Sequence, residues 1–407
     1  MARNGTYRDD NHGKDVLYIG GSDLVRSPNH RAHHFIRFLE QHARRVDVVS
    51  LRPFYAGPYP ASPLSKLRRG IRAYTAEPVN VTDTGVGTEF QVHKLPNRMD
   101  PLLQDVWAYF HLGELARRHY DVGIFGNPDN AILAWMLKKR GIVDSLVYDD
   151  WDYFAGFDRP LYWRLPMAWR ERFSVSIADR VISVGSLLAE LRQEQGARET
   201  FVVPNGVNYQ VFARAQEKKP HPPTLIYTGS IEEWAGLDVS LEGFAQVRAE
   251  IPAARFLIIG PNQNEYGHAL RKQADRLGLG DSICFLGYRP YEELPEFLAE
   301  ADIGVALFWP TDQMKYAFHL KVVEYMAAGL AVVGTRVGET ERIILQAGAG
   351  RAVDFEAEAF AGAVLEMFRD ERALAEYGAR GIEFARPYDW NLVFSDLHEI
   401  IGLRNGR

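Results

Sequence analysis

Residues 319–335 read His-Leu-Lys-Val-Val-Glu-Tyr-Met-Ala-Ala-Gly-Leu-Ala-Val-Val-Gly-Thr. A helical segment leads into the apolar run 330–333, which is typical of a buried parallel strand. Helical segments likewise precede apolar runs at 283–286 and 303–307, and strands at 224–228 and 254–260 come earlier in the chain. Strands that alternate with helices predict a parallel sheet covered on both faces.

The first half of the chain repeats this alternation. Expected strands are 16–20, 46–51, 90–93, 122–125, 146–148 and 181–184, and expected helices are 28–39, 101–118, 129–139 and 161–178. The predicted fold is therefore α/β, with two doubly wound Rossmann-like domains facing each other across a cleft. We expect one domain at 1–210, an exposed linker at 214–223, a second domain at 220–385, and a terminal segment 386–407 with a helix from 391 to 402.

Composition limits the class of protein. The 407 residues are 46% hydrophobic and 25% charged, so a globular protein is expected. A single cysteine, a polar N-terminus and no long apolar run favour a cytoplasmic protein without a signal peptide or a membrane span. Residues 1–205 carry 27 basic against 24 acidic side chains (+3), and residues 206–407 carry 20 against 29 (−9). This excess is too weak for a nucleic-acid binder, but it suits an anionic substrate or lipid surface, or is ordinary surface charge.

Glycines mark the expected end of the first strand in each domain, at Gly20-Gly21-Ser22 and at Gly229-Ser230. Glycine there lets backbone N–H groups approach an anion or a sugar, although simple turns are the alternative. Neither stretch matches GxGxxG or GxxxxGK[ST], which disfavours dinucleotide oxidoreduction and P-loop chemistry. Two substrate-binding walls favour a group-transfer enzyme, while a sugar epimerase or a binding module can share the architecture.

Lys321 and Glu324 lie three residues apart and so share a helix face. If the helix begins near Ala317, its N-terminal amides and Lys321 can neutralise a diphosphate, and Glu324 can accept both hydroxyls of a ribose. The alternative is a solvated salt bridge.

Three segments together resemble glycosyltransferase family 4, which has the GT-B fold. They are 321–335, Val-Pro-Asn-Gly-Val-Asn at 203–208, and Tyr-Thr-Gly-Ser-Ile-Glu-Glu-Trp-Ala-Gly-Leu-Asp at 227–238. The resemblance implies a nucleotide-sugar donor bound by the C-terminal domain, an acceptor bound by the N-terminal domain, and a last helix that crosses back to the N-terminal domain. The expected donor site comprises Gly229, Ser230, Ile231, Tyr288, Phe308, Trp309, His319, Leu320, Lys321 and Glu324.

The chain departs from that family at three positions. Tyr316 stands where family 4 normally has an acidic residue, and Ser230 and Ala235 stand where it has an Arg/Lys pair. Lys321 then becomes the cation expected to meet the diphosphate. Tyr288 is expected near the nucleobase, and Phe308 and Trp309 are either stacking residues or core aromatics.

A second resemblance concerns the N-terminal half. Residues 22–36 and Leu-Val-Tyr-Asp-Asp-Trp-Asp at 146–152, with the Lys-x-x-Glu of Lys321, are similar to the family 70 glucuronosyltransferases of xanthan assembly, although Glu324 stands where they have glutamine. This resemblance implies inversion with Asp152 as general base. Repulsion among Asp149, Asp150 and Asp152 is expected to raise at least one pKa. Helix capping or metal ligation are the other roles open to Asp152.

Further expectations concern the acceptor side and the membrane. Gly20, Gly21, Ser22, His30 and His33 are expected near the cleft, with local hydrogen bonding as the alternative role of the histidines. Neither a metal site nor a cofactor is expected, since the nucleotide-sugar is a co-substrate.

The basic segment 65–74 and the basic aromatic segment 159–173 are expected either to contact anionic lipid or to be a core helix with a basic solvent face.

The sequence therefore predicts transfer of a hexosyl or glucuronosyl group from a nucleoside diphosphate, with UDP favoured, to a glycan acceptor. The resemblances imply an acceptor linked to polyprenyl diphosphate at the cytoplasmic membrane face, and the weak basic excess predicts no nucleic-acid partner. A retaining family 4 transferase and a non-catalytic nucleotide-sugar-binding subunit are the alternatives.

Overall fold

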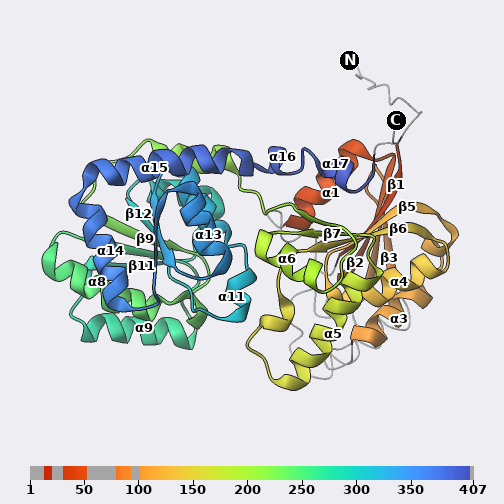
Figure 1. Cartoon of the computed structure of the whole chain (residues 1–407), viewed down its shortest axis with the longest axis horizontal. Coiled ribbons are helices and arrows are strands. Elements are labelled where there is room, and N and C mark those ends of the chain that lie inside the picture. Colours follow the sequence, from red (N-terminus) through yellow and green to blue (C-terminus); the bar gives the residue numbers. More distant parts are fainter. Residues whose placement is uncertain (1–12, 21–30, 53–78, 94–100, 404–407) are drawn as a thin grey trace, which may run out of the picture. The chain divides into compact units, whose positions relative to one another are not determined.

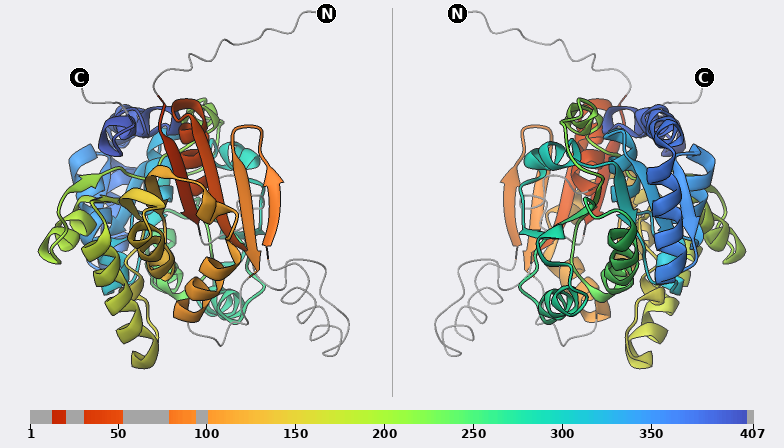
Figure 2. Two further views of the ribbon diagram at one scale, coloured as in Figure 1. Left: turned by 90° about the vertical axis from the view of Figure 1, so that its right-hand side faces the viewer. Right: turned by 90° about the vertical axis from the view of Figure 1, so that its left-hand side faces the viewer.

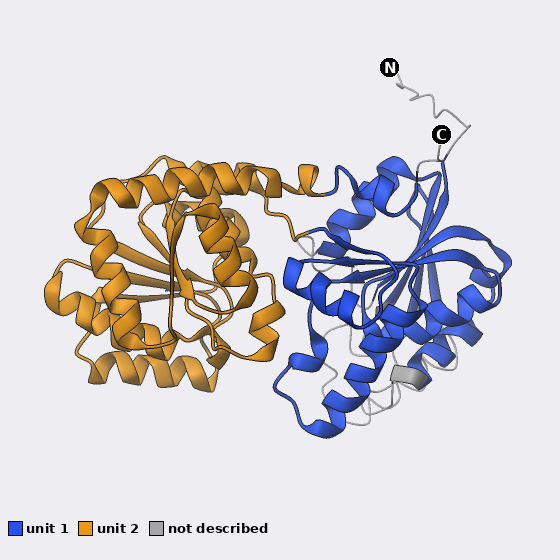
Figure 3. Ribbon diagram, viewed as in Figure 1, with its two compact units in different colours: residues 1–203, 394–407 blue, residues 204–393 orange. Residues whose placement is uncertain are grey.

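The computed structural model describes residues 13–20, 31–52, 79–93 and 101–403 (Figure 1). The chain divides into two compact units, shown in different colours in Figure 3. Unit 1 comprises Met1–Val203 and Phe394–Arg407, and unit 2 comprises Pro204–Val393. The chain therefore leaves unit 1 once and returns to it at its end.

Unit 1 contains an eight-stranded sheet in the order β3-β4-β2-β1-β5-β6-β7-β8. The strands are β1 (Asp15–Gly20), β2 (Arg45–Arg52), β3 (Val79–Asp83), β4 (Thr88–His93), β5 (Tyr120–Phe125), β6 (Val143–Asp150), β7 (Arg180–Ser183) and β8 (Thr200–Val202). All neighbours are parallel except β3 and β4, which form the antiparallel edge seen in Figure 2. The helices are α1 (Arg31–His42), α3 (Pro101–His111), α4 (Ala131–Lys139), α5 (Leu161–Ile177), α6 (Ser186–Glu194) and, from the returning chain, α17 (Leu397–Ile400).

Unit 2 contains a wholly parallel six-stranded sheet in the order β11-β10-β9-β12-β13-β14. Its strands are β9 (Thr224–Thr228), β10 (Arg255–Ile259), β11 (Ile283–Gly287), β12 (Ile303–Ala306), β13 (Ala331–Thr335) and β14 (Gly350–Val353). Its helices are α7 (Tyr209–Phe212), α8 (Leu237–Glu250), α9 (Glu265–Arg276), α10 (Leu294–Leu298), α11 (Asp312–Tyr316), α12 (Leu320–Ala327), α13 (Gly338–Ala347), α14 (Ala357–Arg369), α15 (Glu371–Ala385) and α16 (Trp390–Val393). The strand order reverses between β9 and β12, and ligands of such sheets bind outside the carboxyl ends of the strands at that point.

The predicted α/β class with two doubly wound sheets is confirmed, and the strands that the pattern missed lie at sheet edges. These are β3, β8 and β14, which are only three to five residues long and largely exposed or half-buried, so they lack an apolar run. The helix expected to begin near Ala317 begins at Leu320, because residue 317 is extended and ends the separate helix α11. The expected helix 391–402 is instead two short helices, α16 and α17.

Residues 217–220 of the expected linker 214–223 are exposed as predicted, but the prediction that this segment links the two domains is wrong. The Lys218 amine donates hydrogen bonds to the carbonyl oxygens of Leu298, Ala301 and Ala328. These carbonyls lie at or just beyond the C-terminal ends of two helices, where a cation complements the orphan acceptors. The segment is therefore part of unit 2, and the boundary between the units falls at Val203 and Pro204.

The close approach of α12 to β12 fixes the position of α12 relative to the end of β9. Gly304 is buried in β12, and a Cβ there would lie 2.2 Å from the ring of Tyr325. The Tyr325 hydroxyl in turn accepts a hydrogen bond of 2.8 Å from the backbone N–H of Thr228, at the end of β9. Gly304 of β12 thus lets α12 come close enough to hold the end of the neighbouring strand β9.

We predict that Gly304→Ala destabilises the protein by about 1 to 3 kcal/mol, because the methyl group overpacks a core without space for it. Urea unfolding followed by tryptophan fluorescence measures the change. The matched control is Gly362→Ala on α14, where a Cβ would meet nothing within 4 Å and φ is not in the left-handed region. This control should be neutral or gain about 0.5 to 1 kcal/mol from helix propensity. Equal effects of the two substitutions would contradict the packing argument.

Candidate functional site

The ammonium group of Lys321 lies in a cage of aromatic rings at the point where the strand order of unit 2 reverses. Lys321 is in the first turn of α12. Its Nζ lies 3.9 Å from the ring centroid of Tyr227, 5.3 Å from that of Phe308 and 5.6 Å from that of Trp234. Aromatic faces attract a cation but supply neither a full negative charge nor a hydrogen-bond acceptor lone pair.

The Nζ of Lys321 is buried and has no hydrogen-bond partner among the residues that the structure describes. Burial lowers the pKa of Lys321 to about 7, against the opposing charge of Glu324, which raises it. The expected alternative of a solvated Lys321–Glu324 salt bridge is therefore wrong. A buried lysine whose charge is not compensated gains most from an anion that enters beside it.

Gly229 makes room for this ammonium group. Its φ of +130° belongs to the region that favours glycine, and a Cβ at residue 229 would lie 2.8 Å from Lys321 Nζ. Gly229 and Ser230 are exposed, while the Ile231 side chain is buried, so residue 231 offers a ligand only its backbone. The glycine loop after β9 therefore lies directly against the ammonium group that the first turn of α12 carries.

Glu324 lies one turn further along α12. The Tyr291 hydroxyl donates a hydrogen bond of 3.1 Å to its Oε1, which leaves Oε2 for another donor. Burial raises the pKa of Glu324 to about 7, while the Tyr291 hydrogen bond and the Lys321 charge lower it. A carboxylate with one oxygen anchored and the other open is suited to accept hydrogen bonds from a diol.

The aromatic and histidine residues expected in the donor site occupy different environments. Phe308 is fully buried and stacks on the His319 ring at 3.8 Å, so the expectation that it stacks on a ligand is wrong in this conformation. The His319 ring nitrogens face the Thr340 hydroxyl and the Met314 sulfur, and burial lowers its pKa to about 3. His319 is therefore neutral and contributes no charge.

Three further expected donor residues lie at the surface or at the helix start. Trp309 is 37% exposed and Tyr288 is 72% exposed, so their rings are accessible. Leu320 is the first residue of α12, and its N–H is one of the orphan donors at the helix N-terminus.

In unit 1, two of the three clustered aspartates are used in buried ion pairs. Asp149 pairs with Arg31 of α1 at 2.9 Å. Asp150 receives two hydrogen bonds from Arg192 of α6, at 2.7 and 3.0 Å, and Arg192 also contacts Glu171 of α5 at 3.0 Å. These ion pairs join β6 to three helices in a region that excludes water.

Asp152, the third of the clustered aspartates, takes no part in these ion pairs. It follows β6, is partly buried, and its Oδ1 accepts a hydrogen bond from the backbone N–H of Tyr153 at 2.8 Å. Burial raises the pKa of Asp152 to about 7, and Asp150 and Glu171 add to this by repulsion. The expected rise in pKa is confirmed, but desolvation is its largest cause and repulsion between the aspartates is secondary.

The remaining acceptor-side expectations are partly outside the described residues. Gly20 ends β1, and His33 lies half-buried in the first turn of α1. Gly21, Ser22 and His30 lie outside the described residues, as does the basic segment 65–74. Within the residues that the structure describes, no group of three or more His, Cys, Asp or Glu side chains is arranged to hold a metal ion.

The fold matches solved structures over nearly its whole length. HepE from Anabaena, solved in complex with UDP, aligns with a TM-score of 0.69 and 15% identity, covering 95% of this chain and 99% of that one. Sucrose-phosphate synthase from Thermosynechococcus elongatus gives a TM-score of 0.69 with 18% identity, covering 95% and 98%. This chain has the GT-B fold of glycosyltransferases. Residues 222–370 also match the family model described as Glycosyl transferases group 1.

Sequence relatives match about half of this GT-B chain. A phosphatidyl-myo-inositol mannosyltransferase of Mycolicibacterium smegmatis is 28% identical over 224 residues, covering 54% of this chain and 56% of the relative. A GDP-mannose:cellobiosyl-diphosphopolyprenol alpha-mannosyltransferase of Komagataeibacter xylinus is 25% identical over 228 residues, covering 54% and 55%. The chain thus spans about half the length of the curated relatives it matches.

Several residues of this GT-B chain acquire a role only in the structure. Tyr227, Trp234 and Tyr291 surround Lys321 and Glu324 but are distant from them in sequence. Arg192 and Glu171 anchor the segment next to Asp152 from two different helices. Only Tyr227 carried a signal, because it stands two residues before the glycine of the β9 loop.

Proposed function

We propose that this protein transfers a sugar from a nucleoside diphosphate donor to a glycan acceptor carried on a lipid. The observation that carries the proposal is the buried, unpartnered ammonium of Lys321 beside the Gly229 loop, at the topological switch point of unit 2. A diphosphate supplies the two or more negative charges that this position lacks. The lipid-linked acceptor is supported by the named activities of the relatives, which act on phosphatidyl-inositol and on a diphosphopolyprenol.

The donor roles follow from chemistry within unit 2. Lys321 and the N–H groups of the first turn of α12 bind the diphosphate, and the Glu324 carboxylate accepts the ribose hydroxyls while Tyr291 holds it in place. We favour UDP, which is supported by the structural neighbour HepE, solved in complex with UDP. The name of the Komagataeibacter relative contains GDP-mannose instead, so GDP is the competing nucleotide.

We assign the general base to Asp152. In an inverting transfer the acceptor oxygen bonds to the anomeric carbon, the bond from that carbon to the diphosphate breaks, and the hydroxyl proton passes to a carboxylate. A pKa of about 7 suits a base near neutral pH, and the ion-paired Asp149 and Asp150 are engaged elsewhere. The charge that develops on the leaving diphosphate is then stabilised by Lys321 in its ammonium form.

A retaining transferase is the second candidate. It is favoured by the Komagataeibacter relative, whose name specifies an alpha-mannosyl product from GDP-mannose. The anomeric configuration of the product, determined by NMR, decides between the two reaction courses. The non-catalytic alternative is favoured by Ser230 and Ala235, which lack the cations of family 4.

We predict that Lys321→Met weakens binding of the preferred nucleoside diphosphate by about tenfold or more, because charge-assisted hydrogen bonds of about 1.5 to 3 kcal/mol are lost. Titration calorimetry with UDP, GDP and ADP measures this and identifies the nucleobase. Affinity for the free nucleoside should not change, since it lacks the diphosphate. Glu324→Gln should weaken binding of the nucleoside diphosphate more than binding of its 2′,3′-dideoxy form, which lacks the ribose hydroxyls.

Lys315→Met is the matched control for Lys321→Met, because Lys315 is an exposed lysine that also lies over an aromatic ring, that of Tyr316, at 5.1 Å. It should bind the diphosphate like the wild type. If no diphosphate binds, or if Lys321→Met and Lys315→Met behave alike, the donor site is misplaced.

We predict that Asp152→Asn lowers the rate of sugar transfer at saturating donor by about 10² to 10⁴, with nucleoside diphosphate affinity unchanged. In the wild type this rate should rise with pH through about 7, because the carboxylate is the active form and burial raises its pKa. Transfer of radiolabelled sugar measures both. Asp158→Asn, an exposed aspartate on the same loop, is the control. Full activity of Asp152→Asn would remove the base assignment and leave the donor assignment standing.

A further inference from the structure

The outer face of helix α5 is apolar where a solvent-exposed face is usually polar. Leu161, Tyr162, Leu165 and Trp169 are 66%, 80%, 66% and 55% exposed. Positions 161, 165 and 169 are four residues apart, so these side chains form one stripe along the first half of the helix. Figure 2 shows the N-terminal end of α5, in yellow-green, standing out from the rest of its unit.

The opposite face of α5 is fixed in the protein, so the apolar stripe is not free to turn inward. Met167 packs with Phe154 and Ala155 in a small core. Glu171 accepts a hydrogen bond from the backbone N–H of Phe154 at 2.8 Å and is paired with Arg192. The exposed stripe is therefore a consequence of how the helix is anchored.

The stripe continues onto the neighbouring helix. Trp169 stacks on Phe173 with centroids 5.3 Å apart and an interplanar angle of 8°. Trp135 of α4, 39% exposed, meets the same Phe173 ring edge-on at 6.3 Å. We call Leu161, Tyr162, Leu165, Trp169 and Trp135 the α5 patch.

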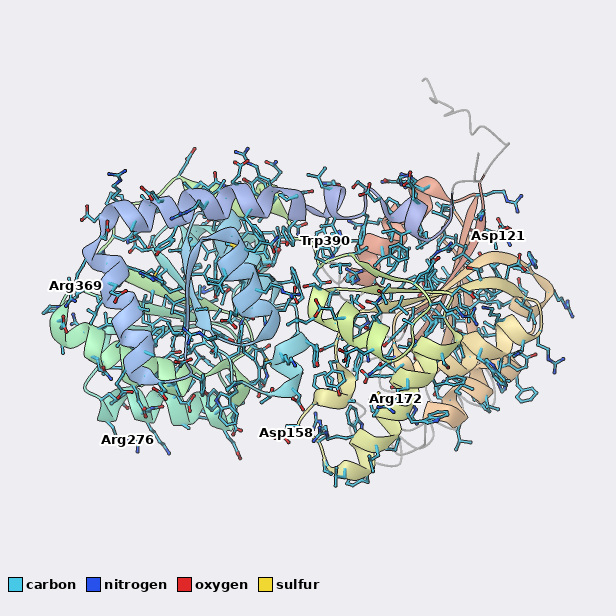
Figure 4. The ribbon with its side chains drawn as sticks, viewed as in Figure 1. Asp121, Asp158, Arg172, Arg276, Arg369 and Trp390 are labelled. Atoms are coloured by element: carbon cyan, nitrogen blue, oxygen red, sulfur yellow. The ribbon has the colours of Figure 1, made fainter. Side chains whose placement is uncertain are left out.

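The charges around the α5 patch are mainly positive. Arg172 is exposed on α5 and Arg159 just before it, and Lys139 and Arg140 are exposed at the end of α4. Asp158 is the exposed acid beside the start of α5, and it is labelled with Arg172 in Figure 4. The one acid within α5, Glu171, is buried and paired. Aromatic and leucine side chains flanked by arginine are typical of helices that lie in the interface of an anionic bilayer.

We propose that the α5 patch docks this protein on an anionic lipid bilayer, with its apolar side chains in the headgroup region and its cations against the lipid phosphates. A bilayer fits better than a second copy of the chain, because a twofold dimer through this patch would place like charges opposite each other. No helix among the described residues is long and apolar enough to cross the bilayer, so α5 lies on it. The loop that carries Asp152 connects the carboxyl end of β6 to α5. Docking through α5 therefore brings this end of β6 toward the lipid.

Vesicle flotation with the full-length protein tests the proposal without any nucleotide, so its result does not depend on the donor assignment. The protein should float with vesicles of phosphatidylcholine containing about 30% phosphatidylglycerol, and much less with phosphatidylcholine alone. Leu165→Ser together with Trp169→Ser should lower the partition coefficient by about tenfold or more. Arg159→Gln with Arg172→Gln should lower it by about fivefold per arginine and only on the anionic vesicles.

Leu345→Ser is the matched control, because Leu345 is 63% exposed on α13 of unit 2. It should float like the wild type. Circular dichroism and nucleotide binding should be unchanged in the patch variants, which are on the surface. Wild-type protein that stays off anionic vesicles, or patch variants that float like Leu345→Ser, would overturn the proposal. A concentration-dependent dimer in sedimentation, lost in the patch variant, would also overturn it and assign the patch to self-association.

Discussion

Unit 2 buries the ammonium group of Lys321 with no hydrogen-bond partner among the described residues. Removing a charge from water is expensive unless a partner compensates for it, and the rings around Lys321 compensate only in part. Burial lowers the pKa of Lys321 to about 7, so the amine can lose its charge near neutral pH. A bound diphosphate would restore the charge, so affinity for the ligand and the protonation of one lysine are linked. Gly229 leaves space for this group, because a Cβ at residue 229 would lie 2.8 Å from the Lys321 ammonium.

In unit 1, by contrast, the buried carboxylates near Asp152 are paired with arginines. Asp149 and Asp150 are paired with arginines from α1 and α6, and Glu171 is paired from α5, so these charges hold elements together. Asp152 is left two residues beyond the strand with a raised pKa. The same network holds the buried face of α5 and thereby exposes its apolar stripe. One set of ion pairs thus positions both the proposed base and the proposed membrane surface.

The sequence predicted the two doubly wound sheets because buried parallel strands are apolar runs, and β1, β9 and β13 are buried at every position. It missed β3, β8 and β14 because these short edge strands are largely exposed or half-buried and so lack an apolar run. Lys321 and Glu324 were found because their spacing is local. The aromatic cage, Tyr291 and the arginine partners were not, since tertiary contacts between distant segments leave no periodicity. The segment 214–223 was expected to link the domains because it is Pro-rich and basic, but it belongs to unit 2, where Lys218 donates hydrogen bonds to three backbone carbonyls.

The number of protons taken up when a diphosphate binds tests whether Lys321 contacts the phosphates. At a pH of about 8 the diphosphate is fully ionised and Lys321, with a pKa of about 7, is mostly neutral, so an anion that binds it should draw one proton from solution. Calorimetric titration of UDP, or of whichever diphosphate binds, in buffers of different ionisation enthalpy gives the number of protons. We predict that diphosphate binding takes up close to one proton in the wild type and close to none in Lys321→Met. Binding of the wild type without proton uptake would contradict it, because Lys321 would then be either charged beforehand or remote from the phosphates.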